Sequence, residues 1–201
     1  MGFFLDGNWT TKERINIYNS VRAVGTKLQS VSHDNKSVSE VFKKNFKKVT
    51  YTKSIDPNHS QNCQGSQGNV VCYSHGDGSF TPDERNLTHE LGHIFSQNNN
   101  EKPYADLKNP ELQLYDSQGN WVMGTHKDGR NKGQYERTVL GYKSGFIPDV
   151  YHGQEWTDFQ TNANEDYADM FLNWVYDSFD YSLEANQAGV LRYNWIEDNV
   201  S

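Results

Sequence analysis

Two histidines four residues apart, with a glutamate directly after the first, lie in the segment NLTHELGH at residues 86–93. Positions four apart on an α-helix are one turn on and rotated by only about 40°. His89 and His93 therefore project from one helix face, where two imidazole nitrogens can bind a common ion. Glu90 lies about 100° round the helix, so its carboxylate can hold a water without binding the ion. The pattern predicts a zinc site with Glu90 as general base.

A catalytic zinc site needs a third protein ligand and an open fourth position. One common extension of the motif has a glycine and a third histidine where this chain has Ser96 and Asn99. The segment NEDYADMF offers acids instead. Glu165 can bind the ion, and Asp169, on the same helical face, can accept the ring N–H of a zinc-bound histidine. Acids also favour helix starts, which is the alternative explanation for Glu165. Three histidines are rivals of Glu165 as the third ligand: His75, His126 and His152. The alternative explanation for each is a place in a loop or a hydrogen-bonding role.

The helix that must position the histidines has a strong start signal. Thr81 precedes Pro82, and Glu84 follows three residues after Thr81, so an N-cap, a first-position proline and a capping box coincide. The pattern predicts a helix over residues 82–97 that ends in QNNN. The motif HELGH would then lie inside a rigid element.

Other segments predict helices and strands around it. Residues 11–29 have helical periodicity, with an apolar face of Ile15, Tyr18, Val21, Val24 and Leu28. A capping box of Ser37 and Glu40 begins a second helix, which has Val38, Val41, Phe42 and Phe46 on one face. Residues 47–54 and 69–75 are typical of strands, and residues 112–125 of a hairpin.

A second group of helices is predicted toward the C-terminus. Residues 163–178 form a helix with an apolar face of Ala168, Phe171, Leu172 and Val175, and a last helix falls within 183–200. Helices outnumber strands, so we expect an α+β fold: a small mixed sheet, the active-site helix and a helical C-terminal lobe. No internal repeat or low-complexity linker interrupts the chain, which favours one domain over residues 1–201.

Composition excludes some classes of function. The net charge of −7 argues against a nucleic-acid partner, since phosphate neutralisation needs a basic face. The apolar stretches are too short for a membrane span. Aromatic residues make up 13 %, enough to build a globular core at 201 residues. We expect a protein or peptide as partner and favour a monomer.

The two cysteines, Cys63 and Cys72, enclose the Gly-containing turn QGSQGNVV. This arrangement favours a small disulfide-closed loop in an exported protein, with a pair of buried free thiols as the alternative. The start, MGFFLDGN, becomes polar too quickly to be an intact signal peptide. We therefore expect a secreted or other extracytoplasmic protein from which a leader has been removed. A cytoplasmic location is the alternative.

HELGH followed by ExxAD resembles the gluzincins, the zinc metallopeptidases related to thermolysin and neprilysin. The resemblance implies His89, His93 and Glu165 as ligands of one Zn²⁺, Glu90 as base, and Asp169 as the residue that orients a histidine. TNANEDYADMF is also similar to the corresponding helix of the anthrax lethal factor catalytic domain. A zincin-like fold is implied, in which an antiparallel edge strand before the active helix binds extended substrate. We expect residues 70–75 to be that strand.

The match covers residues 81–97 and 161–175, and the intervening segment is longer than in many gluzincins. The family also places an oxyanion-stabilising group in the site. Three residues are candidates for this oxyanion-stabilising group, and the alternative for each is a role in packing or a place on the surface: Tyr151, His152 and Tyr193.

The sequence therefore predicts a zinc endopeptidase. One alternative is a catalytically inactive, zinc-stabilised exported binding domain. Another is an adhesion or carbohydrate-binding module using Trp121, Trp156 and Trp174.

Overall fold

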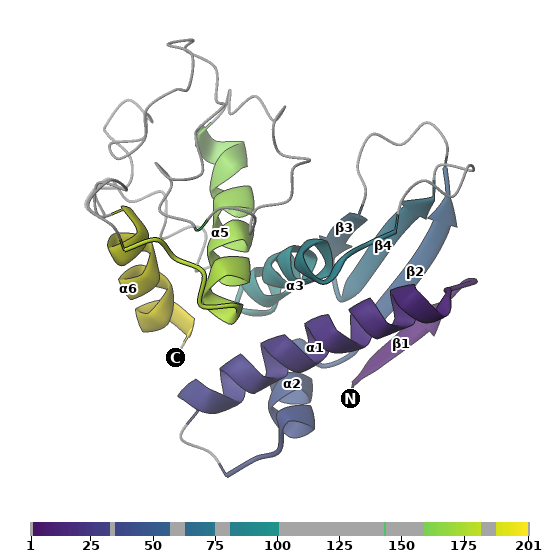
Figure 1. Cartoon of the computed structure of the whole chain (residues 1–201), viewed down its shortest axis with the longest axis horizontal. Helices are drawn as coiled ribbons and strands as arrows, with labels where there is room; N and C mark the ends of the chain where they lie inside the picture. Colours follow the sequence, from purple (N-terminus) through teal and green to yellow (C-terminus); the bar gives the residue numbers. More distant parts are fainter. Residues whose placement is uncertain are drawn as a thin grey trace. The chain divides into compact units, whose positions relative to one another are not determined.

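The computed structural model describes residues 2–32, 35–56, 63–74, 81–100, 143, 159–181 and 188–200. The chain divides into two compact units, Met1–Asn100 and Glu101–Val200. The first unit contains a sheet and three helices, and the described part of the second contains two helices (Figure 1). The fold is α+β, as the sequence predicts. The predicted hairpin at 112–125 lies outside the described residues.

The sheet of the first unit is mixed. Its strands stand in the order β1-β2-β4-β3, with β1, β2 and β4 parallel and β3 antiparallel to β4. Their bounds are Phe3–Asp6 for β1, Val49–Ile55 for β2, Cys63–Ser66 for β3 and Asn69–Ser74 for β4. The prediction that residues 70–75 form the edge strand is wrong, because β4 pairs on both sides. The antiparallel edge strand is β3, whose short sequence CQGS contains no apolar run.

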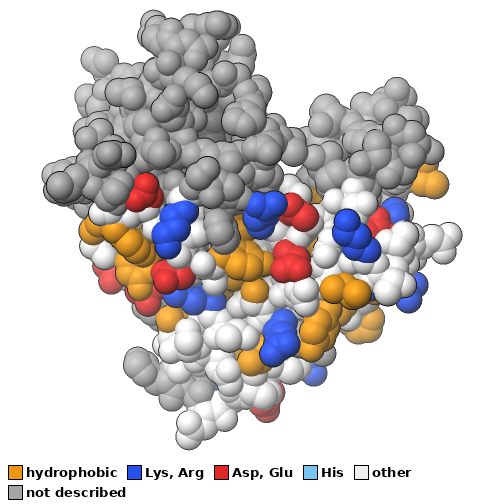
Figure 2. Space-filling model, viewed as in Figure 1, with side chains coloured by type: hydrophobic (Ala, Val, Ile, Leu, Met, Phe, Trp, Pro, Cys, Tyr) orange, Lys and Arg blue, Asp and Glu red, His pale blue; other side chains and the backbone are white. Residues whose placement is uncertain are grey.

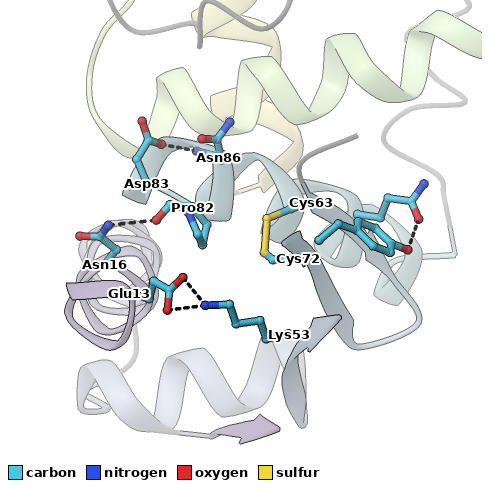
Figure 3. Close-up of a disulfide and its surroundings, with 10 residues drawn as sticks. Glu13, Asn16, Lys53, Cys63, Cys72, Pro82, Asp83 and Asn86 are labelled. Carbon is cyan, nitrogen blue, oxygen red and sulfur yellow. Dashed lines mark hydrogen bonds and ion pairs between the residues drawn. A yellow bond between two sulfur atoms is a disulfide. The ribbon is translucent and has the colours of Figure 1, made fainter. Parts of the chain in front are cut away.

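One face of this sheet is covered by helices. Tyr51, Val70 and Cys72 lie on that face and are buried. On the same face Lys53 reaches across to Glu13 of helix α1, Thr11–Val31, with Nζ–Oε distances of 2.7 and 2.9 Å (Figure 3). The ion pair therefore ties α1 to the middle of the sheet.

Helices α1 and α2, Val38–Phe46, begin at capping boxes. At α1 the box is Thr10 with Glu13, and at α2 it is the predicted Ser37 with Glu40. In each, the N-cap hydroxyl accepts from the backbone N–H three residues on, and the glutamate accepts from the N-cap backbone N–H. These bonds fix where each helix starts.

The apolar face of α1 is partly different from the predicted one. Ile15 and Tyr18 are exposed, and Ile17 is buried in their place. The other predicted positions, Val21, Val24 and Leu28, are buried. The early part of the stripe was placed wrongly because three apolar residues occur within four positions, so periodicity alone does not choose among them.

In the second unit α5, Phe159–Val175, and α6, Ala188–Val200, pack together. The rings of Tyr167 and Trp195 are edge to face with centroids 6.1 Å apart. The Trp174 indole N–H donates to Glu197, which joins the two helices a second time. The predicted apolar stripe would bury one side of helix α5. The helix is buried on more sides than that, since every residue from Tyr167 to Trp174 is buried.

Among the described residues, no helix combines the length and the apolar character that crossing a bilayer requires. On the face drawn in Figure 2, Lys and Arg side chains alternate with Asp and Glu over the described part of the surface, and no broad basic area forms there.

Candidate metal centre

The helix that holds the HELGH motif is α3, Glu84–Asn98. It begins two residues later than predicted, and its N-cap is Asp83 rather than Thr81. The Asp83 carboxylate accepts from the backbone N–H groups of Arg85 and Asn86, at 2.9 and 2.8 Å. One carboxylate thus satisfies two of the free donors at the helix start.

The two motif histidines meet on one face of α3, as predicted. Their Nε2 atoms are 3.2 Å apart, and the ring planes are inclined at 85°. Two nitrogen ligands of a tetrahedral zinc ion, each 2.0–2.1 Å from the metal, stand about 3.3 Å apart. The separation also suits a hydrogen bond between the two rings. The pair therefore fits two corners of a zinc site when both Nε2 atoms are unprotonated.

The side chains of the motif are buried. The exposed fractions are 1 % for His89, 7 % for Glu90 and 6 % for His93. Burial argues against a pair of surface histidines on a solvated helix and leaves a pair of core histidines as the alternative to a metal site. It also leaves the Glu90 side chain with little contact with solvent.

The predicted third ligand belongs to the second unit. Glu165 is half-buried on α5, and Asp169 lies one turn further along the same helix and is buried. The Asp169 backbone carbonyl accepts from the Asn173 side-chain amide at 2.7 Å. Among the described residues, His89, His93 and Glu165 offer two imidazole nitrogens and a carboxylate oxygen, a group that could hold a metal ion.

Hydrogen bonds from α1 hold the start of α3. The Asn16 amide donates to the Pro82 carbonyl at 2.9 Å, and the Asn19 amide donates to the Glu84 carboxylate at 2.6 Å. One turn further along α3, the buried hydroxyl groups of Ser20 and Thr88 join the two helices, and Thr88 directly precedes His89. The first turn and the first histidine are therefore fixed to α1.

The other end of α3 is held by two different elements. The Gln97 side-chain oxygen accepts from the backbone N–H of Gln67, in the turn between β3 and β4, at 2.6 Å. The Asn98 amide donates to the Asn45 carbonyl of α2 at 3.0 Å. The rings of Phe46 and Phe95 also pack together, with centroids 5.8 Å apart. Helix α3 is thus held near both ends.

One residue beside the motif was missed by sequence reasoning. Gly65 of β3 lies against the backbone of Glu90 so closely that a Cβ there would be 2.3 Å from the Glu90 carbonyl oxygen. A glycine inside a strand often marks such a close approach, which is the signal that could have identified it. The segment QGSQGNVV is typical of a turn by its composition, but Gly65 lies in strand β3.

Of the remaining candidates, the structure describes only Tyr193. His75, His126 and His152, the rival ligands, and Tyr151 lie outside the described residues. Tyr193 is half-buried on α6, where its ring meets Phe179 and Tyr181 edge to face. Burial, followed by the nearby Glu197, raises the pKa of Tyr193. These contacts favour a packing role for Tyr193.

Comparisons with known proteins return no match: no family model fits the chain, and neither a curated protein nor a solved structure is significantly similar to it.

Proposed function

We propose that this protein is a zinc-dependent endopeptidase with a zincin-like fold, in which His89, His93 and Glu165 bind one zinc ion. The main support is the 3.2 Å separation of the two Nε2 atoms on a buried helix, next to a buried glutamate. The donor set of two imidazoles and one carboxylate is typical of catalytic rather than structural zinc.

When bound, the ion supplies a Lewis acid that polarises a peptide carbonyl and lowers the pKa of a water toward neutrality. Glu90 accepts the proton as the water oxygen bonds to the carbonyl carbon. It then passes the proton to the amine nitrogen as the C–N bond breaks. Asp169 accepts the ring N–H of a ligand histidine and so keeps its Nε2 free for the metal.

The chain also has the edge strand that peptide binding by strand addition requires. Strand β3 is antiparallel to β4, and among the described strands β4 is the one neighbour it has in the sheet. An extended substrate added to β3 would present its backbone along the strand that contacts Glu90, which suits cleavage of unfolded or extended segments.

The test compares wild type with Glu90→Gln for zinc content and for cleavage of a denatured protein. We expect one zinc per chain in both, and loss of cleavage by a factor of at least about 100 in the variant. Glu40→Gln on α2, where the side chain is exposed, is the matched control and should cut normally. Wild type that holds zinc but cuts nothing would favour the inactive zinc-stabilised domain. Equal rates in wild type and Glu90→Gln would refute the role of the base.

A further inference from the structure

The contact between Gly65 and Glu90 involves backbone on the helix side. A Cβ on Gly65 would lie 2.3 Å from the carbonyl oxygen, 2.9 Å from the carbonyl carbon and 3.1 Å from the Cα of Glu90. In an α-helix the carbonyl of residue 90 accepts from the N–H of residue 94. A side chain at residue 65 must therefore either weaken this hydrogen bond or displace one of the two elements.

The β3–β4 hairpin that presents Gly65 is closed at both ends. At one end the disulfide joins Cys63 to Cys72, which stand directly opposite each other (Figure 3). At the other end Gln67 and Gly68 form a two-residue turn with φ of 48° and 77°, the type I′ pattern that matches strand twist. The Gln67 N–H then bonds to Gln97 at the end of α3. Gly65 stands between these two fixed points.

We propose that the disulfide-closed β3–β4 hairpin positions the catalytic base, with Gly65 as the positioning residue that sets where Glu90 stands. The proposal rests on the proposed function. Gly65 would affect the reaction through the position of Glu90.

The structure separates this role from metal binding by the two histidines. The spacing between His89 and His93 is internal to α3 and does not depend on β3. The Gly65 contact acts on the backbone of Glu90 itself. A methyl group at residue 65 must push the two elements apart by about 1 Å, a displacement of the size that costs about 100-fold in rate.

The activity test uses Gly65→Ala, with Ser66→Ala as the matched control on the next, exposed position of β3. We expect kcat to fall about 100-fold in Gly65→Ala, with zinc content unchanged. The acid limb of the pH profile of kcat/KM should also move, since this limb reports the base. Ser66→Ala should match wild type in all three. A lower rate with an unmoved acid limb would mean a smaller folded fraction and would overturn the proposal.

A second measurement needs no peptidase activity. Amide hydrogen exchange in the zinc-free protein reports how firmly the residue 90 carbonyl holds the N–H of Ile94. We expect this amide to exchange at least about 10-fold faster in Gly65→Ala, while the amide of Val24 in α1 stays near its wild-type rate. An equal rise at both residues would indicate general destabilisation and contradict the proposal.

The two measurements distinguish failure of the proposal from failure of the proposed function. Wild type without peptidase activity, combined with faster exchange confined to α3, would refute the endopeptidase and keep the hairpin as the element that holds Glu90. If Gly65→Ala does not fold, the double variant Cys63→Ala/Cys72→Ala replaces it, because it loosens the hairpin without a clash. Unchanged exchange at Ile94 in that variant would overturn the proposal.

Discussion

The hydroxyl groups of Ser20 and Thr88 lie 2.9 Å apart in the buried contact between α1 and α3. The Thr88 hydroxyl also lies 2.7 Å from the Glu84 carbonyl, to which it donates its single proton. Ser20 is therefore the donor between the two hydroxyls. The residue directly before His89 is thus held both within α3 and from α1.

Replacing Ser20 by Ala should lower the free energy of unfolding by about 1 kcal/mol, because the Thr88 oxygen loses a buried donor. Urea denaturation measures the change. Ser30→Ala, at an exposed position on the same helix, is the control and should be near neutral. Equal stability of the two variants would show that the hydroxyl pair contributes nothing to holding α3.

The ion pair between Glu13 and Lys53 predicts a pH dependence of stability. Burial raises the pKa of Glu13, but hydrogen bonds from Lys53 and Thr10 outweigh it, and the net pKa is lowered. A carboxylate with a lowered pKa in the folded state stabilises the fold above its unfolded-state pKa, about 4.3, and loses that contribution as pH falls through the folded value.

Glu13→Gln should therefore lower the free energy of unfolding by about 3 kcal/mol at pH 7 and by clearly less at pH 3. Denaturation at both pH values measures this. Glu40→Gln is the matched control, because Glu40 has the same place in a capping box but is exposed. A loss in Glu13→Gln that is the same at pH 7 and pH 3 would contradict the ionic role.

The disulfide should contribute slightly under 3 kcal/mol. Cys63 and Cys72 are nine residues apart, and closing a loop of this size lowers the entropy of the unfolded chain by about that amount. Urea unfolding of the oxidised protein and of Cys63→Ala/Cys72→Ala measures the difference. Free thiols in the unfolded, unreduced protein, detected by a thiol reagent, would show that the bond does not form.

Asp169→Asn should weaken zinc binding about 10- to 100-fold without a large change in fold, since the amide is a poorer acceptor for a ligand histidine. Competition with a chelator of known zinc affinity measures the constant. Asp177→Asn, at an exposed position after the end of α5, is the control. Unchanged affinity in Asp169→Asn would remove Asp169 from the zinc site.

Local patterns in the sequence predicted much of the fold. The capping box at Ser37, the shared face of His89 and His93, and the pairing of Cys63 with Cys72 depend on neighbours a few residues away, and each is confirmed. The start of α3 was predicted two residues early, because Thr81 and Asp83 both suit an N-cap. The carboxylate of Asp83 reaches two amides.

Other features depend on contacts between distant segments. The four residues of β3 have no strand signal of their own, and only pairing with β4 makes them a strand. The interior place of β4 follows from its parallel pairing with β2, although β3 lies between these two strands in the sequence. The approach of Gly65 to Glu90 is of the same kind, since it arises only when the hairpin packs on α3.

The central claim is that His89, His93 and Glu165 bind one zinc ion, and anomalous diffraction at the zinc absorption edge tests it most directly. We expect one peak per chain, about 2.0–2.1 Å from the Nε2 atoms of both histidines and about 2.0–2.2 Å from a Glu165 carboxylate oxygen. A crystal grown with zinc that shows no peak beside the histidines, or a peak with Glu165 turned away from it, would contradict the claim.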